Sequence, residues 1–550
     1  MNRRDFLKLN ATITATAAVQ LPRLAFAGTP SSQYTTLSQS TPSAEYDVFV
    51  YGSTPSGVGA ALYAAREGCR VLLACPKNHA GGMLASGLGG LDSRHGGKMH
   101  GDYVTTYGDA VRAVYQRRKE SGAPEWALKG PKRGSTEPSV AEKVFDDFLS
   151  SQGDRITHWH AHHLVAAQTI SSRITRIELE SSDGTRRAVA ARTFIDCTYE
   201  GDLAAAAGVP FRVGREPEDE FGESLAGIRY IDWRTGKELR VPETGSASRG
   251  IQAYCARCIF TTDTKNLVPI RKPANYDQHL MDLMPLGMDF ATGRLQMRTY
   301  GKEMANYKWE LNGSINQPTS LNCPGVNWEW PEAGRALRAR LERYHIEHAA
   351  SFVWFLQHDK NVPDKVRDYW RRAGLHAGEF TGNNHWPWQI YVREARRIEG
   401  RARVTQHNFT LDPKLGRTPP VAHAIAIGEY PFDVHPCRDR RHEINGLQEG
   451  AIWYPRNIPT TAQPGQIPYE ALLPKTLDNL LVPVALSATH IGMAVARMEP
   501  VWMTSGQISG LAAAEAKATN RDVAHIDPTL LPPRANLVSD PWAAGLVTKK

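Results

Sequence analysis

The sequence predicts an α/β fold in which a domain built on a parallel sheet is divided in the chain by an inserted α+β domain. Three observations support this. A short apolar run, "YDVFVYG" at 46–52, is typical of a buried parallel strand. It is followed by the helical pattern "SGVGAALYAAREG" and by a second apolar run, "CRVLLAC". A further strand and small-residue helix come only near the end, in "NLLVPVALSATHIGMAVARMEPVWMTSGQISGLAAA".

Length and composition limit the classes of protein that this chain can represent. At 550 residues it is too long for one core, which predicts two or three domains. Hydrophobic residues make up 41% and charged residues 22%, so most of the chain is expected to fold. The net charge of +8 is not gathered into a basic stripe. We therefore expect no nucleic-acid partner and no membrane-surface partner.

The first residues have the layout of an export signal. Arg3-Arg4 is followed by Phe6-Leu7-Lys8, by an Ala/Thr-rich run and by Ala25-Phe26-Ala27, as in twin-arginine signals with an A-x-A cleavage site. Residues 1–27 are thus predicted to be a signal peptide, and residues 28–44 a flexible linker. The mature protein is expected to be periplasmic or secreted. No other segment reaches the ~18 apolar residues of a membrane helix, so we predict no membrane span.

The turn after the first strand resembles G-x-G-x-x-G but has Thr54 at the second glycine position. Pro55 keeps the preceding residue out of the helical region and is favoured at the first helical position. Thr54 is therefore predicted to cap the helix, while Gly52 makes the turn and Gly57 allows close packing. The helix start, including Ser56, still offers backbone N–H groups to a pyrophosphate.

The second strand ends at Cys75, where a dinucleotide site normally has an acid that binds a ribose hydroxyl. Losing that bond costs ~1.5–3 kcal/mol, which weakens binding without abolishing it. The run "HAGGMLASG" at 79–87 adds a second glycine pair, Gly81-Gly82, followed by Met83. Extra backbone N–H groups near the pyrophosphate favour FAD over a nicotinamide dinucleotide.

Cysteine and histidine spacing gives no strong metal prediction. Seven cysteines are odd in number and too sparse for a disulfide scaffold. The pair in "CARC" at 255–258 is interpreted as two small buried residues, with a redox disulfide as the alternative. His158, His160 and His162 alternate along one predicted strand in "THWHAHHLV", and at this spacing they diverge, so we predict no metal site.

Several segments together resemble a known family. They include "VYGSTPSGVGAAL", "GGMLASGLGG", "EPSVAEKVFDDFL", "TFIDCTYEGDLAAAAGVPFRVGRE", "YVREARR" and the long C-terminal segment quoted above. In this order they are similar to the FAD-dependent oxidoreductases that are distantly related to fumarate reductase and succinate dehydrogenase flavoproteins. The resemblance implies a glutathione-reductase-like, Rossmann-type FAD domain in two parts, 45–215 and 465–525. A substrate domain would occupy 216–464, and a C-terminal tail 526–550.

The resemblance also implies residues near the cofactor. The strand "TFIDCTYEGD" would return the chain to the cofactor sheet, and the final helix would point its N-terminus at the flavin, where its dipole stabilises negative charge. The full set of predicted cofactor residues is Gly52, Thr54, Pro55, Ser56, Gly57, Cys75, Gly81, Gly82, Met83, Val165, Thr198, Gly201, Asp202, Arg497, Gly506 and Gln507.

Two groups are candidates for the chemistry. In "YVREARR", Arg393 and Arg396 are predicted to share a helix face and to hold a carboxylate or developing negative charge. In "GEYPFDVHPC", Asp433 and His435 are two apart on a predicted strand, so the carboxylate would orient the imidazole and raise its basicity. His435 is the predicted base, and His490 is the alternative.

Three functions remain open from the sequence. The first is an exported enzyme that oxidises an alcohol or C–H group of a polar small molecule or carbohydrate by hydride transfer to flavin. Its electron acceptor would be a quinone, a redox protein or oxygen. The second is reduction of an unsaturated organic acid, and the third is a flavin-binding protein without redox turnover. The chain has no C-x-x-C-H haem motif, which favours the first.

Overall fold

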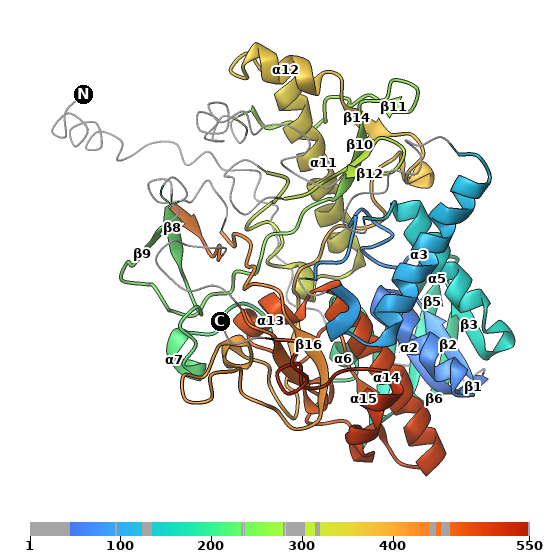
Figure 1. The fold of residues 1–550 in the computed structure, drawn as a ribbon. Helices are drawn as coiled ribbons and strands as arrows, with labels where there is room; N and C mark the ends of the chain where they lie inside the picture. The colour runs from blue at the N-terminus through green and yellow to red at the C-terminus, as the bar shows by residue number, and fades with distance from the viewer. Residues whose placement is uncertain are drawn as a thin grey trace.

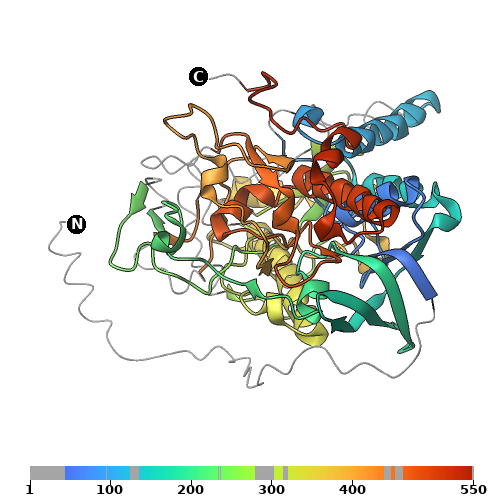
Figure 2. The same cartoon turned by 90° about the horizontal axis from the view of Figure 1, so that it is seen from below.

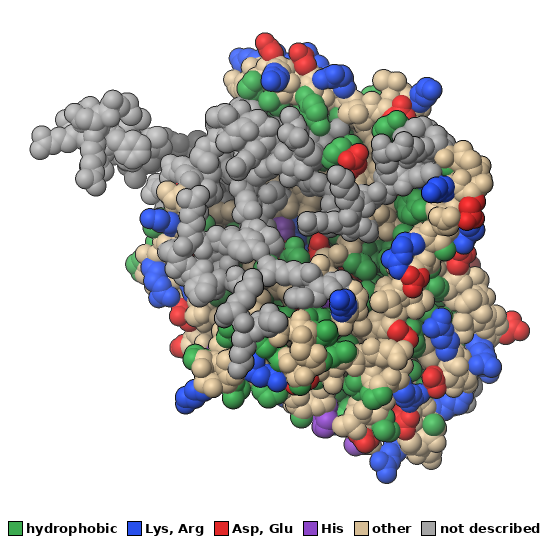
Figure 3. Space-filling view, in the orientation of Figure 1, with side chains coloured by type: hydrophobic (Ala, Val, Ile, Leu, Met, Phe, Trp, Pro, Cys, Tyr) green, Lys and Arg blue, Asp and Glu red, His purple; other side chains and the backbone are tan. Residues whose placement is uncertain are grey.

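The computed structural model describes residues 44–93, 96–123, 135–232, 235, 237–278, 281, 303–313, 320–438, 447–452 and 462–547. The predicted signal peptide, and the linker up to residue 43, lie outside this part of the chain. Within it, no helix combines the length and apolar character needed to cross a membrane. On the face seen in Figure 3, basic side chains are scattered among acidic ones and form no single patch among the coloured atoms.

The central sheet is parallel at its core and is completed by the far end of the chain. Its parallel strands are β3 (Ile156–Trp159), β2 (Val71–Ala74), β1 (Ala44–Tyr51), β6 (Arg186–Asp196) and β19 (Leu480–Leu481), in this spatial order. The first half of β6 pairs with the antiparallel strand β5 (Arg173–Ser181), which pairs in turn with β4 (His162–Ile170), and the second half of β6 pairs with β19. This is the predicted Rossmann-type α/β arrangement.

Helices cover the sheet and explain its apolar strands. In β1, Val48, Phe49 and Val50 are fully buried, as expected for a strand covered on both faces. The covering helices in Figure 1 are α2 (Pro55–Arg66), α3 (Asp102–Glu120), α5 (Pro138–Ser150) and α14 (Glu499–Thr519). Although α14 is far from α2 in sequence, the two helices pack along each other.

Small residues make the contact between α14 and α2 close, as predicted. A Cβ atom on Gly506 would lie 2.1 Å from the carbonyl oxygen of Ser56, and one on Gly510 would lie 2.4 Å from that of Ala60. No larger side chain fits at either position. The C-terminal segment is therefore an integral layer of the N-terminal sheet domain.

The inserted region is mixed α and β. Its five-stranded sheet has the order β11-β14-β10-β13-β12, and the long helix α11 (Arg335–His358) packs beside α12 (Asp364–Trp370). Figure 2 shows α11 in yellow, below and to the left of the parallel strands and red α14. The strands are β10 (Cys258–Thr261), β11 (Leu267–Val268), β12 (Glu303–Met304), β13 (Lys308–Leu311) and β14 (Gly374–His376).

Shorter elements connect these layers. They are α6 (Asp202–Ala206), β7 (Phe211–Arg212), α7 (Glu218–Phe221), β8 (Tyr230–Asp232), β9 (Lys237–Leu239), β15 (Arg397–Ile398), β16 (Ala424–Gly428), β17 (Leu447–Glu449), β18 (Gly465–Pro468), α13 (His490–Ala496) and α15 (Leu531–Arg534). Residues after 526 pack on the body of the protein, because Leu531 is fully buried and the Asp102 N–H donates to the Ala535 carbonyl at 2.9 Å.

Two local predictions are wrong. The segment "THWHAHHLV" forms two strands, β3 and β4, because Ala161, with a φ of 51°, interrupts the extended backbone between them. The segment "YVREARR" is extended, ending in β15, so Arg393 and Arg396 share no helix face. All of its residues are buried, and buried partners on every side override a helical pattern.

Candidate active site

Two cavities lie where the sheet domain meets the insertion. The larger, about 480 Å³, is lined by residues that follow the ends of β1, β2 and β6, the edge where ligands bind in such sheets. The smaller, about 160 Å³, is lined almost wholly by polar and charged side chains. The two differ in the kind of group that they can hold.

Many of the predicted cofactor residues line the larger cavity: Gly52, Thr54, Cys75, Gly82, Val165, Thr198 and Asp202. Val165 lies at an irregularity in β4, where the pairing with β5 shifts between Leu164 and Ala166. Residues from widely separated parts of the sequence thus converge on the space expected for a dinucleotide.

The turn at Thr54 has the predicted geometry. The Thr54 hydroxyl accepts from the Gly57 N–H at 3.2 Å and donates to the Cys197 carbonyl at 2.8 Å. Pro55 is the first residue of α2. Gly52 has a φ of 97°, and a Cβ on Gly57 would lie 1.8 Å from the Gly52 carbonyl oxygen. The turn at Gly52 therefore packs directly against the first turn of α2. The backbone N–H groups at the start of this helix can then bind a pyrophosphate, which fits the expected cofactor.

The second glycine pair packs against this turn. The Gly81 N–H donates to the Ser53 carbonyl at 2.7 Å, and the Met83 N–H donates to the Tyr199 hydroxyl at 3.0 Å. A Cβ on Gly82 would lie 2.5 Å from that same hydroxyl. Gly82 lines the cavity, while Gly81 and fully buried Met83 hold the loop in place.

An acidic residue of the insertion, Glu342, lies near Cys75, which directly follows β2. The Cys75 sulfur accepts from the Lys77 N–H at 3.4 Å. The Lys77 ammonium pairs with Glu342 of α11 at 2.9 Å, and both side chains line the larger cavity. The expected acid is absent from β2, but a carboxylate still borders this end of the cavity.

Arg396 lies on the cofactor side, not with Arg393. Its guanidinium pairs with Asp202 at 2.8 Å, and Arg338 of α11 pairs with the same carboxylate at 2.6 Å. Burial raises the pKa of Asp202, but Arg338 and Arg396 lower it to about 2. Gly201, with a φ of 68°, begins α6 beside this ionised carboxylate, which ties the sheet domain to the insertion.

Asp433 and His435 do come together, at the smaller cavity. Val434, between them, forms a β-bridge with Ile452, so the segment is extended. The side chains of Asp433 and His435 therefore point to the same side of it. The His435 Nε2 lies 3.5 Å from the Asp433 Oδ1, and the Arg497 guanidinium lies 2.9 Å from the Asp433 Oδ2. The Asn322 amide donates to the His435 Nδ1 at 3.0 Å.

The protonation of this pair differs from the prediction. Burial, followed by the charges of Arg393 and Arg497, lowers the pKa of His435 well below its usual value, so the expectation that Asp433 raises its basicity is wrong. With Nδ1 accepting from the Asn322 amide, the ring proton lies on Nε2. Burial raises the pKa of Asp433 against the effect of Arg497, and its Oδ1 accepts no hydrogen bond.

Two buried arginines, Arg257 and Arg497, line the smaller cavity, and a third, Arg393, lies over the ring of Tyr391, which lines it too. Arg257 pairs with Glu310 and Arg497 with Asp433. Arg393 is fully buried, donates to the Ala253 carbonyl and the Cys255 sulfur, and pairs with no carboxylate in the described part of the chain. An unbalanced buried cation is costly unless an anion joins it, so the site favours an anionic ligand group.

His490 lies behind the residues that line the smaller cavity. Its Nδ1 is 2.9 Å from both oxygens of Glu394, and it does not line the smaller cavity. Burial would raise the pKa of Glu394, but the charge of His490 lowers it to about 2. Gln252 donates to Glu394 and accepts from the His435 N–H, so this pair positions the histidine at the cavity.

The three C-terminal residues predicted at the flavin have separate places. Arg497 lines the smaller cavity. Gly506 packs on α2, and Gln507 accepts from the Tyr103 N–H at 3.3 Å and donates to Asp102 of α3. Gly506 and Gln507 line neither cavity and serve helix packing.

Sequence reasoning missed several residues at the smaller cavity and next to it: Arg257, Glu310, Asn322, Tyr391 and Glu499. They come from distant segments with no shared motif. Only Glu499 could have been found from the sequence, because an acidic residue inside the largely apolar run "GMAVARMEPVWM" is unusual and points to a special role. Cys255 and Cys258 are buried free thiols, in line with the simpler interpretation of that pair.

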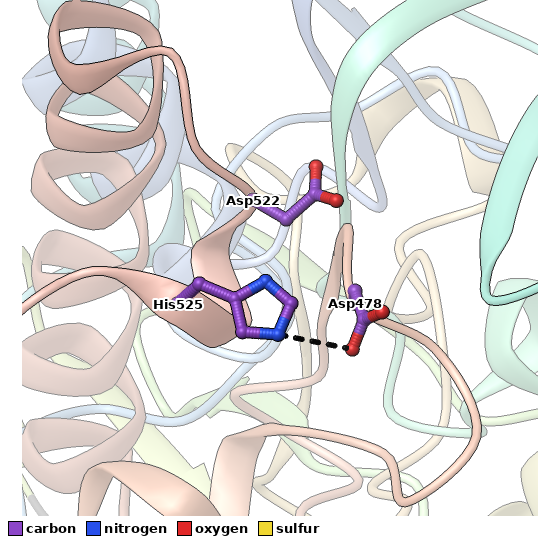
Figure 4. A group of neighbouring side chains, drawn as sticks. All are labelled: Asp478, Asp522 and His525. Carbon is purple, nitrogen blue, oxygen red and sulfur yellow. Dashed lines mark ion pairs between the residues drawn. The ribbon is translucent and has the colours of Figure 1, made fainter.

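A cluster of Asp478, Asp522 and His525 lies elsewhere, where the chain before β19 meets the chain after α14 (Figure 4). Arg401 pairs with Asp478 at 2.6 Å, and Arg173 pairs with Asp522. His525 is 3.9 Å from Asp478. Because both carboxylates already have arginine partners, this cluster is a surface ion-pair network.

No curated protein matches the chain. Among solved structures, it is similar to the anhydrotetracycline hydroxylase OxyS from Streptomyces rimosus at 12% identity, covering 37% of this chain and 44% of that one, with a TM-score of 0.23. It is also similar to thioredoxin reductase from T. acidophilum at 18% identity, covering 28% of this chain and 34% of that one, with a TM-score of 0.17. In both cases the match spans less than half of the other protein, and such scores carry no argument.

The family comparison covers nearly the whole described chain. The model of the family described as FAD dependent oxidoreductase matches residues 47–535, from β1 to the end of α15. This range includes both parts of the sheet domain, the insertion and all residues of the two cavities. The chain belongs to the family of FAD-dependent oxidoreductases, and its cofactor is FAD.

Proposed function

We propose that the protein oxidises an alcohol or C–H group of a small polar molecule or carbohydrate. The carrying observation is the small cavity, in which the Asp433 Oδ1 is buried without a hydrogen-bond partner beside His435 and Arg497. When bound, FAD supplies the hydride acceptor. The protein must then supply a proton acceptor and fixed charges.

Within this proposal Asp433 accepts the substrate proton. Its Oδ1 is free, and burial brings its pKa closer to neutral, which suits a general base. The His435 Nε2–H faces this oxygen, and Arg497 fixes the other oxygen. His435, predicted from the sequence as the base, here becomes the residue that orients Asp433.

The substrate class follows from Arg393. Arg393 does not line the smaller cavity, but its buried charge beside Tyr391 has no carboxylate partner in the described residues and would attract a substrate carboxylate or another anionic group bound there. Replacing it in Arg393→Met should raise the Kd of an acidic substrate at least 10-fold and change that of a neutral analogue less than 3-fold. Equal losses for both ligands would contradict the anionic class.

The same arginines support a second candidate, reduction of an unsaturated organic acid. The direction can be tested by mixing the oxidised protein with sugars and hydroxy acids without oxygen, and the photoreduced protein with unsaturated acids. Bleaching of the flavin in the first set supports oxidation, and recovery of its colour in the second supports reduction. A flavin that resists photoreduction would support the non-redox alternative.

We also propose export by the twin-arginine route, which suits a protein that must fold around FAD before it is transported. The support is the layout of residues 1–27. Replacing Arg3-Arg4 with Lys-Lys should leave FAD-loaded precursor in the cytoplasm. Export of that variant at the usual rate would contradict this. Outside the cytoplasm, electrons would pass to a quinone, a redox protein or oxygen.

A further inference from the structure

Glu499, the first residue of α14, is buried, with 3% of its surface exposed, and lines neither cavity itself. The Tyr199 hydroxyl donates to its Oε1 at 2.8 Å, and Tyr199 lines the larger cavity. Arg257, whose charge acts on Glu499, lines the smaller one. After their proposed occupants, we call the larger cavity the cofactor cavity and the smaller one the substrate cavity. Glu499 therefore lies directly behind Tyr199 of the cofactor cavity and near Arg257 of the substrate cavity, in the wall that separates them.

Two polar atoms at this wall have no partner. The Glu499 Oε2 and the Trp502 Nε1 are buried and form no hydrogen bond. Residues three apart on a helix share a face, and the Trp502 ring lies 5.3 Å from that of Tyr199. Buried polar atoms are nearly always satisfied, so two neighbouring exceptions beside a cofactor cavity indicate a ligand that completes them.

The protonation state decides what Glu499 can offer. Burial raises the pKa of Glu499 to about 8, against the Tyr199 hydrogen bond and the Arg257 charge. The other titratable groups that interact with it are Tyr103 and Tyr107 of α3, whose pKa values burial raises. At neutral pH the carboxyl is therefore neutral, and its Oε2 can donate a hydrogen bond.

We propose that Glu499 binds FAD as a neutral carboxyl that donates a hydrogen bond to an oxygen or nitrogen of the cofactor. Ionisation of Glu499 then removes the donor and places a negative charge beside acceptor atoms of FAD. A neutral carboxyl also leaves the positive N-terminal end of α14 uncancelled next to the cofactor. The inference rests on FAD binding and not on the proposed substrate, so either can fail without the other.

The test measures the Kd of FAD for the apoprotein between about pH 6 and about pH 10 by flavin fluorescence. Wild-type affinity should fall about 10-fold through the pH at which Glu499 ionises, the equivalent of one hydrogen bond. Glu499→Gln keeps a donor and should bind with an affinity that does not change with pH. Glu499→Leu should bind at least 10-fold more weakly at neutral pH.

A matched control is Glu223→Gln, because Glu223 is also fully buried with a raised pKa, but its hydrogen-bond partners Gln406 and Thr489 line neither cavity. It should keep the wild-type affinity and pH dependence. The same pH dependence in Glu499→Gln as in the wild type would overturn the proposal.

An independent readout is the infrared carbonyl band of a protonated carboxyl at neutral pH, which should shift when FAD binds and be absent in Glu499→Gln. A band that FAD leaves unmoved would also overturn the proposal. If Glu499→Gln fails to fold, the response of the wild-type band to FAD still tests the proposal, because that measurement needs no variant.

Discussion

The two cavities are built in opposite ways. The cofactor cavity is formed by backbone: a tight turn at Gly52, a capped helix start at Thr54 and a glycine at position 82 where a Cβ would collide with Tyr199. The substrate cavity is formed by long charged side chains that reach inward from segments with little regular structure, such as 391–396 and 431–437. The first depends on the absence of side chains, and the second on their charge.

This difference predicts different failures. A substitution in the cofactor wall should change packing and so remove the folded, FAD-loaded protein. A substitution of similar shape in the substrate wall should leave the fold intact and change only reactivity. Four experiments test whether the two regions separate in this way.

The largest effect is expected from Gly57→Ala. The new methyl group would lie 1.8 Å from the Gly52 carbonyl oxygen, so backbone must move. Such overpacking costs at least ~1–3 kcal/mol and would displace the helix start from the pyrophosphate. Purified protein should contain no FAD and should unfold at a lower temperature.

Gly108→Ala in α3 is the control, because its Cβ would meet only the end of Arg112, at 3.4 Å. It should bind FAD normally and gain up to ~1 kcal/mol of stability from better helix propensity. If Gly57→Ala also retains FAD, the cofactor wall is less strictly packed than its geometry indicates.

The second effect concerns reactivity alone. Asp433→Asn keeps the shape of the side chain but removes the proton acceptor, so flavin reduction by the true substrate should slow by about 10²–10⁴-fold. His435→Ala should slow it less, because His435 only orients Asp433 in this geometry. Stopped-flow bleaching of the flavin measures both. A larger loss in His435→Ala would restore the histidine as the base.

The third experiment probes the wall between the cavities through stability. The unfolded-state carboxyl of Glu499 ionises near its ordinary pKa of 4.5, whereas the folded state keeps the proton up to about 8. Wild-type stability is therefore lost as pH rises through this window, by roughly 5 kcal/mol. Urea unfolding of the apoprotein should show that Glu499→Gln lacks this loss at about pH 9.

Its control is Glu120→Gln, an exposed position at the end of α3, which should follow the wild-type curve. Parallel curves for the wild type and Glu499→Gln would show that the buried carboxyl ionises at its ordinary pKa.

The smallest effect is expected from Cys75→Glu. A restored carboxylate could accept from a ribose hydroxyl, a bond worth ~1.5–3 kcal/mol, so FAD should bind about 10-fold more tightly. Titration of the apoprotein with FAD measures this, with Cys75→Ser as the control that adds no charge. Weaker binding would show that the cavity has been rebuilt around cysteine and that Glu342 repels a second acid.

The cofactor side was largely predictable because neighbouring residues decide it. Thr54 and Pro55 fix the helix start within two positions, and the alternation of apolar runs fixes β1, α2 and β2. The return of β6 to the sheet and the packing of α14 followed from the resemblance and from small residues such as Gly506.

The substrate side was predictable only in part, because its residues meet through long-range contacts. Asp433 and His435 were found as a pair, since alternation places them on one side. The local pattern of "YVREARR" indicated a helix, but burial decided otherwise and sent Arg393 and Arg396 to different sites. The pKa of His435 depends on Arg257 and Arg497, which no local pattern connects to it.

The division of the sheet has a consequence for how the protein is made. The strand β1 ends at residue 51, but its sheet gains β19 only at residue 480, and α2 gains its covering helix only when residues up to 519 have been synthesised. At about 5–20 residues per second, a ribosome needs on the order of 20–90 s for this stretch. During that time the apolar face of α2 is without α14. We therefore expect the nascent chain to need protection from aggregation until α14 has been made, and FAD to bind only after that point.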